Sequence, residues 1–247
     1  MEKKLQYLDW LSSGFFHKLY AGTTANEAEP FINQLVQYLQ PAPGSRVLDS
    51  ACGTGFNCRH LAAKGFDVTG VDAATANIEA AKPMEKEGLE FYLHDLRLPF
   101  WGNYFHVALN LFTSFGFYRT RREHDNAIRT IASGLQSNGL LVIDYPNTHY
   151  EESRLKTQES KQLGETQYEW KRWQTETSFF KTITVSDPSL PAPLEYNIER
   201  AKFSLGDFTD MLSFQKMQVQ EVFGNYQLAP YHLNDTPRLI VIAKKID

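Results

Sequence analysis

Hydrophobic and polar positions in the middle of the chain follow two alternating patterns. Short apolar runs of strand length, without the polar alternation of a half-exposed sheet, lie at 47–49, 66–71, 89–93, 106–110 and 140–145. Strands of a parallel sheet have this composition because helices cover both faces of the sheet. The longer segments between the runs carry apolar residues at helical spacing. The alternation predicts an α/β fold with a doubly wound, Rossmann-like sheet.

The segment before the first strand reads as helical. Asn26 and Glu29 form a capping-box pattern ahead of an apolar face at 31–39. The helix that they predict ends where Pro41 breaks the chain. We therefore expect residues 1–45 to form a helical N-terminal cover on the sheet.

The pattern changes beyond the fifth strand. Segments 182–185 and 194–203 alternate apolar and polar residues around the turn sequence DPSLPAP, and 168–173 reads as a third strand. One more helix and two more apolar runs follow. The chain is therefore expected to form a single domain over residues 1–247. Its seven-stranded sheet is interrupted after the fifth strand by an antiparallel β insertion at 150–205.

Composition narrows the class of protein. Of the 247 residues, 42% are hydrophobic and 22% charged, which is ordinary for a globular domain. The net charge of −4 does not indicate the excess of positive charge that nucleic-acid binding requires. We expect no membrane span and no signal peptide, because no apolar run approaches about 18 residues. The two cysteines favour a reduced, cytoplasmic setting. Cys52, Cys58 and His60 lack a matching further ligand, so no metal site is expected.

The sequence VLDSACGTG, at 47–55, has the form of a ligand-binding loop between a strand and a helix. A dinucleotide fold uses the spacing G-x-G-x-x-G. Gly53 and Gly55 match it, but the third position holds Cys58. Asp49 at the strand end also disfavours a pyrophosphate and favours a ligand with a positive group, such as S-adenosylmethionine. A nicotinamide-dependent oxidoreductase is the weaker alternative.

This loop and the segments after it resemble the motifs of class I S-adenosylmethionine-dependent methyltransferases. VLDSACGTG is similar to the first motif and VTGVDAA to the second, whose acid binds ribose. HDLRLPF, FHVALNLFTSFG and NGLLVIDYPN are similar to the third, fourth and fifth, in the family's order. The resemblance covers residues 45–147 and implies S-adenosylmethionine as the cofactor.

The resemblance also implies which residues contact that cofactor. In the glycine loop, the backbone approaches its methionine end and Asp49 attracts the ammonium group. Asp72, at the end of the second strand, can accept from both ribose hydroxyls, and Asp95 can accept from the adenine amino group. The full set of expected cofactor contacts is Tyr20, Asp49, Ala51, Cys52, Gly53, Gly55, Asp72, Ala73, Asp95, Leu96, Asn110 and Leu111.

No motif in the chain identifies the methyl acceptor. The segment after the fourth strand reads NLFT, without the N-P-P-Y of adenine methyltransferases or the Pro-Cys pair of cytosine methyltransferases. The chain is similar to glycine N-methyltransferases, in which a tyrosine at the place of Tyr20 lies near the cofactor. Pro146 stands where those enzymes carry an arginine for the substrate carboxylate. The resemblance implies a small-molecule acceptor, with a protein or peptide acceptor, or cofactor binding without catalysis, as the alternatives.

Aromatic residues outside the five motifs are candidates for the acceptor site. The insertion contributes Tyr168, Trp170 and Trp173 as a predicted roof, and the C-terminal loop contributes Tyr226 or Tyr231. No catalytic residue is predicted, because a neutral amine needs no strong base for methylation, whereas a hydroxyl group does.

Overall fold

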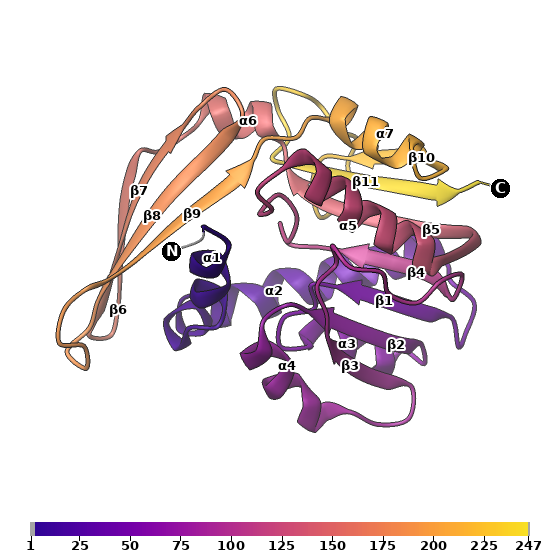
Figure 1. Cartoon of the computed structure of the whole chain (residues 1–247), viewed down its shortest axis with the longest axis horizontal. Helices are drawn as coiled ribbons and strands as arrows, with labels where there is room; N and C mark the ends of the chain where they lie inside the picture. The colour runs from indigo at the N-terminus through magenta and orange to yellow at the C-terminus, as the bar shows by residue number, and fades with distance from the viewer. Residues whose placement is uncertain (1–2, 247) are drawn as a thin grey trace.

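The computed structural model describes residues 3–246, apart from the side chains of residues 3–5 and 21–26. Its centre is a seven-stranded sheet, here sheet A, in the order β10-β11-β5-β4-β1-β2-β3. The strands are β1 (Arg46–Ser50), β2 (Asp67–Asp72), β3 (Leu89–Leu93), β4 (Phe105–Asn110), β5 (Leu135–Pro146), β10 (Met217–Phe223) and β11 (Arg238–Lys245). The first five are parallel and β11 is antiparallel to β5. The predicted doubly wound α/β fold is confirmed (Figure 1).

Helices cover both faces of sheet A, as its apolar strands require. One face packs against α5 (Arg121–Gly134) and α7 (Leu205–Ser213). The other packs against the end of α2 (Gly14–Leu39), α3 (Phe56–Ala63) and α4 (Thr75–Ala81), which the short helix η1 (Lys82–Met84) follows. Adjacent residues of β1 point to opposite faces of the sheet. Leu48 packs in the core under α5 and α7, and Val47 packs in the core under α2, α3 and α4. This division explains why the strand sequences show no polar alternation.

The N-terminal segment differs from the prediction in one respect. It holds α1 (Lys3–Leu11) and a continuous α2, which begins at Gly14 and not near Asn26. Ser13 caps α2, because its hydroxyl accepts from the N–H of Phe16 at 3.0 Å. The pattern at Asn26 is therefore not a helix start. Only tertiary packing shows why the helix begins earlier, since Phe16 and Leu19 pack against the insertion.

The insertion forms a second, four-stranded antiparallel sheet, here sheet B, in the order β6-β7-β8-β9. After α6 (Thr148–Ser153) come β6 (Gln158–Leu163), β7 (Thr166–Gln174), β8 (Ser178–Ser186) and β9 (Leu194–Ala201). The three predicted strands are confirmed. Sequence patterns missed β6, because its residues, QESKQL, are almost all exposed and lack an apolar face. Its pairing with β7 reveals it.

Sheet B stands to one side of sheet A, with α1 and the first turns of α2 between them (Figure 1). An aromatic core joins these helices to sheet B; it includes Trp10, Leu19, Tyr168, Trp170 and Ile183. The Tyr168 hydroxyl also donates to the carbonyl oxygen of Phe15 at 3.0 Å. The distal part of sheet B is therefore covered by the N-terminal helices.

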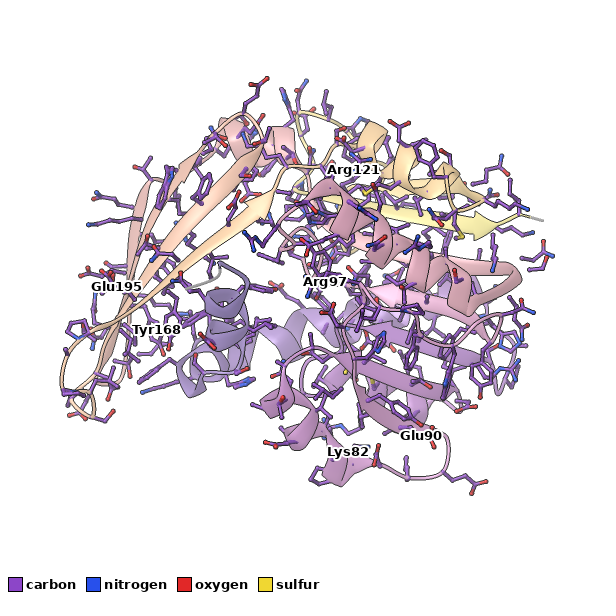
Figure 2. The ribbon with its side chains drawn as sticks, in the orientation of Figure 1. Lys82, Glu90, Arg97, Arg121, Tyr168 and Glu195 are labelled. Atoms are coloured by element: carbon purple, nitrogen blue, oxygen red, sulfur yellow. The ribbon has the colours of Figure 1, made fainter. Side chains whose placement is uncertain are left out.

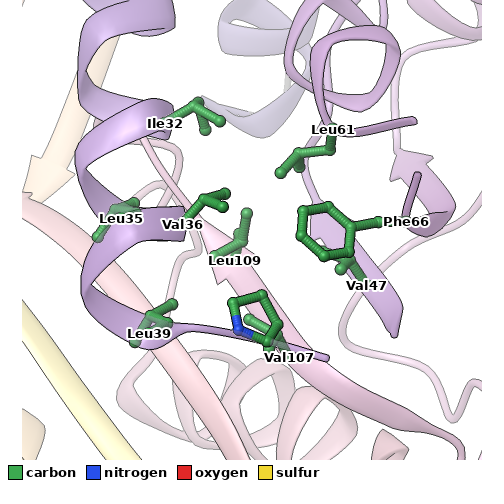
Figure 3. A pocket seen from close by; sticks show the side chains of 10 residues that line it. Ile32, Leu35, Val36, Leu39, Val47, Leu61, Phe66, Val107 and Leu109 are labelled. Carbon is green, nitrogen blue, oxygen red and sulfur yellow. The ribbon is translucent and has the colours of Figure 1, made fainter. Parts of the chain in front are cut away.

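The packing of α2 on sheet A leaves a small apolar void of about 20 Å³. Figure 3 shows α2 on one side of it, through Ile32 and Val36, and Val107 and Leu109 of β4 on the other. No polar side chain lines it. Among the described helices, none is both long and apolar enough to cross a membrane.

Candidate functional site

A cavity of about 810 Å³ lies at the carboxyl edge of sheet A. Its floor comes from the loop after β1, the end of β2 and the loop after β4, and its roof from sheet B and the N-terminal helices. The carboxyl ends of parallel strands meet at one edge of a sheet, where open α/β folds bind ligands. The volume lies within the range of about 300–1,000 Å³ that is usual for small-molecule sites.

Most of the predicted cofactor residues line this cavity. They are Tyr20, Ala51, Cys52, Gly53, Asp72, Ala73, Leu96 and Leu111. The remaining residues, Asp49, Gly55, Asp95 and Asn110, are not part of its wall. The structure thus brings together segments that are distant in the sequence, and the individual cofactor contacts stay predictions.

The loop after β1 is shaped by residues in the left-handed region. Ala51 has φ 69°, Gly53 φ 57° and Gly55 φ 81°. The N–H groups of Ala51 and Cys52 both donate to the carbonyl oxygen of Val71, at 2.8 and 2.9 Å, which fixes the loop on β2. A Cβ atom on Gly55 would lie 2.6 Å from Cζ of Phe91. Glycine is therefore required at Gly55 for packing, whereas the space around Gly53 is open toward a ligand.

Asp72 joins the end of β2 to this loop. Its Oδ2 accepts from the N–H of Gly53 at 2.9 Å, and its Oδ1 accepts from the N–H of Ala74 at 2.8 Å and from Asn77 Nδ2 at 3.2 Å. Burial raises the pKa of Asp72, and these hydrogen bonds oppose that shift. A carboxylate has about four lone-pair sites, so Asp72 retains acceptor capacity toward the cavity that it lines.

Asp49 and Asn110 lie behind the wall of the cavity. Asp49 is only 1% exposed and accepts from Cys58 Sγ at 3.4 Å. Burial raises its pKa to about 6. Asn110 donates through Nδ2 to the carbonyl oxygen of Ser50 at 2.9 Å, which ties β4 to β1. Both side chains support the strand ends beneath the loop, and the ammonium contact of Asp49, directly or through water, stays a prediction.

Asp95 is held in an ion-pair network beside the cavity. Arg97 donates to it through Nη2 at 2.7 Å and also pairs with Glu123 at 2.5 Å. These partners raise the pKa of the Arg97 guanidinium. Leu96, the residue between them in the sequence, does line the cavity. The third motif therefore presents its apolar residue to the cavity, with the acid to one side.

A buried ion pair fixes the loop after β4. Phe112 and Thr113 have φ values of 57° and 63°, which non-glycine residues rarely adopt. Asp144 of β5 accepts from the N–H of Phe112 at 2.8 Å and pairs with Arg238 of β11 at 2.6 Å. Arg238 also donates to Thr113 Oγ1 at 3.0 Å. The sequence analysis missed this pair, although an acid within the apolar strand LLVIDYP was a signal for it.

The three aromatic residues predicted to form the roof of the acceptor site do not form it. Tyr168 and Trp170 are buried in the aromatic core with the N-terminal helices, and Trp173 stacks on Phe180 with ring centroids 5.4 Å apart. None of the three predicted residues, Tyr168, Trp170 and Trp173, lines the cavity. The residues of sheet B that do line it are Arg172, Phe179, Phe180, Lys181, Ile198 and Arg200.

The position of each residue along its strand explains why Arg172 lines the cavity and Tyr168 and Trp170 do not. Tyr168, Trp170 and Arg172 alternate along β7 and therefore share one face. The N-terminal helices cover that face at Tyr168 and Trp170, whereas Arg172 lies beyond them, where the face opens over sheet A. Of the C-terminal candidates, Tyr226 lines the cavity and Tyr231 does not.

Known proteins were then compared with the chain. A family described as a methyltransferase domain matches residues 20–180. The chain belongs to this family. Glycine N-methyltransferase of Rattus norvegicus is 27% identical over 235 residues, which cover 84% of the chain and 78% of that protein. A dTDP-3-amino-3,4,6-trideoxy-alpha-D-glucopyranose N,N-dimethyltransferase of Streptomyces venezuelae is 27% identical over 122 residues, 47% of the chain and 50% of that protein.

A solved structure of an S-adenosylmethionine-dependent methyltransferase from Clostridium acetobutylicum has the same fold. Its TM-score is 0.77 at 15% sequence identity, covering 90% of the chain and 92% of that structure. The protein is thus a class I methyltransferase, as the sequence motifs implied, and S-adenosylmethionine is its cofactor.

The floor of the methyltransferase cavity suits that cofactor. Asn57 and Asn77 line it, and each keeps a buried Oδ1 atom without a hydrogen-bond partner in the described part of the chain. Buried polar atoms are normally paired, and the described part of the chain supplies no donor to these two oxygens. The sequence analysis singled out neither asparagine. The methyltransferase shows no cluster of metal-ligating side chains among its described residues, and His60 contacts Asn33 at 3.0 Å instead.

Proposed function

We propose that this methyltransferase transfers the methyl group to a small-molecule acceptor, by direct displacement, in the cavity between the two sheets. The observation that carries the proposal is the continuity of that cavity. The motif residues line only its floor, and it extends past them to side chains of sheet B and the N-terminal helices. The names of the rat and Streptomyces relatives, which specify glycine and an amino sugar, support an acceptor of this size.

S-adenosylmethionine, when bound, supplies a methyl group on a positively charged sulfur. The chain's part is to position the two reactants, which supplies most of the catalysis in a displacement of this kind. In the proposal, Gly53 and Asp72 hold the cofactor against the floor. The loop at 111–114, fixed by Asp144, lies below the reacting atoms. Tyr7 and Phe117, stacked with centroids 3.7 Å apart, exclude water from one side.

The proposal includes the arrangement of the chain around this site. Residues 1–45 act as the N-terminal cover, and residues 150–205 close the acceptor side within one domain. We propose a cytoplasmic location and no nucleic-acid partner, on the grounds of the two free cysteines and the net charge of −4. A protein or peptide acceptor is the second candidate. The cover of helices and sheet B over the cavity favours the smaller acceptor.

The test has two stages. First, calorimetric titration with S-adenosylhomocysteine establishes that the purified protein binds the spent cofactor. Second, transfer of a labelled methyl group is measured with a library of small amines, acids and phenols, and in parallel with a peptide library. Uptake by a small molecule is the expected result. Uptake by peptides alone would favour the second candidate, and cofactor binding with no uptake in either library would indicate a protein that binds without catalysis.

A further inference from the structure

The roof of the cavity carries a cation from each of three neighbouring strands. Arg172 on β7, Lys181 on β8 and Arg200 on β9 all line the cavity. In the strand register Arg172 is directly opposite Lys181, and Arg200 is opposite Phe179, two residues from Lys181 on the same face. Like charges at directly opposite positions destabilise an antiparallel pair. Sheet B therefore concentrates positive charge where it faces the cavity.

The two arginines have carboxylate partners, and among the described residues the lysine has none. Arg172 pairs with Glu159 at 2.9 Å, and Arg200 pairs with Glu151 of α6. No carboxylate or other acceptor within residues 6–20 and 27–246 takes a hydrogen bond from Lys181, although Glu151 exerts a favourable longer-range attraction on it. Burial, and then Arg172 and Arg200, lower the pKa of Lys181 to about 8. At neutral pH the ammonium group is thus predominantly charged, and no described carboxylate is paired with it.

Arg200 shows the same incomplete pairing at one atom. Its Nε is buried and has no hydrogen-bond partner in the described part of the chain. Its guanidinium carbon lies 5.1 Å from the centroid of Phe179 and 5.6 Å from that of Tyr145, so aromatic rings hold it in place. A charged group that is left buried and incompletely paired costs free energy. In this fold neither Lys181 nor the Arg200 Nε atom gains a structural contact that offsets that cost.

The opposite side of the cavity has the opposite charge. Asp72 and Glu27 line the floor and the N-terminal wall, whereas Glu151 lines the cavity beside Arg200, its ion-pair partner. A cofactor with an ammonium and a sulfonium group matches the acidic floor, whereas at the roof Glu159 and Glu151 pair with the two arginines and leave Lys181 for an anion. The cavity is therefore polarised between its two ligands.

From this geometry we infer that the methyl acceptor is an acidic small molecule whose carboxylate or phosphate binds Lys181 between Arg172 and Arg200. The inference rests on the proposed function and specifies its substrate class. An anion held at the roof directs the remainder of the acceptor toward the loop at 111–114, below the proposed position of the methyl group. Arginine side chains bind carboxylates and phosphates in a fixed fork, and lysine binds them as a point charge.

The test measures acceptor binding without turnover, on the full chain saturated with S-adenosylhomocysteine. The probes are benzoate, phenyl phosphate, the neutral benzamide and the cationic benzylamine, which share one ring and differ in charge. Calorimetry or ligand-observed NMR is used on the wild type and on Lys181→Met, Lys181→Arg and Lys171→Met. Lys171 precedes Arg172 on β7 and is exposed, so it provides the matched control.

At least one anion is expected to bind tenfold or more tightly than benzamide, and the better of the two identifies carboxylate or phosphate as the preferred group. Lys181→Met is expected to lower that affinity at least fivefold, whereas Lys181→Arg and Lys171→Met retain it. Retention by Lys181→Arg separates anion binding from a role as general base. Equal binding of benzamide or benzylamine, or an unchanged affinity in Lys181→Met, would refute the inference. Failure of the proposed function has a different signature, which is loss of S-adenosylhomocysteine binding or of methyl transfer.

Discussion

Sheets A and B face the same cavity, but their buried charged side chains differ in whether they have partners. At sheet A, Asp72 and Asp144 each accept several hydrogen bonds from the backbone and side chains around them. At sheet B, Lys181 has no partner in the described part of the chain, and it lies opposite another cation. The two carboxylates of sheet A are thus paired within the fold. The charge of Lys181 on sheet B is unpaired there, and under our inference an anionic acceptor supplies the missing charge.

The difference also concerns specificity. The floor is lined by residues of the first, second, third and fourth motifs that the sequence analysis identified, among them Gly53, Asp72 and Leu96. The roof is built from residues outside those motifs. Buried charge without a partner is tolerated where function requires it, at a cost in stability.

The largest expected effect lies at sheet A. Arg238→Met removes the partner of Asp144, which is fully buried. Removing one member of a buried ion pair destabilises a protein by about 3–5 kcal/mol, because the remaining charge stays buried. Urea unfolding should show a loss of that size. Arg121→Met, which breaks exposed pairs with Asp125 and Asp207, is the control, with an expected loss below about 1 kcal/mol.

Removing a buried charge from sheet B should stabilise the protein, whereas removing Arg238 from sheet A destabilises it. Lys181→Met removes a charge that the fold disfavours, so the free energy of unfolding at pH 7 should rise, by about 3 kcal/mol for a shift of this size. Since the pKa of Lys181 is lowered from 10.5 to about 8, the unfolded chain binds more protons between those pH values. Wild-type stability therefore increases as the pH rises through this window.

The difference in stability between Lys181→Met and the wild type should depend on pH, because only the charged form of Lys181 is disfavoured. The advantage of Lys181→Met should be complete below pH 8 and absent above pH 10.5. Urea unfolding at intervals between these values measures it. Lys171→Met, at an exposed position, should lie within about 0.5 kcal/mol of the wild type throughout. A destabilised Lys181→Met protein would contradict the picture of an unpaired roof charge.

The cofactor side can be tested through Asp72. Asp72→Ala should lower the affinity for S-adenosylhomocysteine at least tenfold, which corresponds to at least ~1.4 kcal/mol, because the carboxylate lines the cavity and orders Gly53. Calorimetry measures the affinity. Asp67→Ala, at the other end of β2, should leave it unchanged. If Lys181→Met reduced this affinity as strongly as Asp72→Ala, the division between floor and roof would be wrong.

The smallest effect concerns the void under α2. Val107→Ile adds one methyl group beside an apolar space of about 20 Å³ and should stabilise the protein by about 0.5 kcal/mol. Val142→Ile adds the same group at a buried position that does not line the void, and should destabilise by about 1 kcal/mol. Thermal unfolding of the two variants compares them. If both variants changed the stability equally, the added methyl group of Val107→Ile would not be filling the void.

Sequence patterns predicted the strands of sheet A because each is a short apolar run with a turn or helix signal beside it. They misplaced the start of α2, since the capping pattern at Asn26 is local and the packing of Phe16 and Leu19 on sheet B is not. They missed β6, whose polar residues carry no periodic signal. Figure 2 shows how widely charged side chains such as Arg97, Arg121 and Glu195 are distributed over the molecule, so charge alone did not identify the roof.

The sequence by itself determined the cofactor side of this methyltransferase. The glycine loop, Asp72 and Leu96 lie at the ends of consecutive strands, and a parallel sheet brings such ends to one edge. Only the tertiary structure decided the acceptor side. The alternation of β7 gives Trp170 and Arg172 the same face, and the cover of the N-terminal helices alone determines which of them reaches the cavity. Arg172, Lys181 and Arg200 come together through strand register, which the linear pattern does not encode.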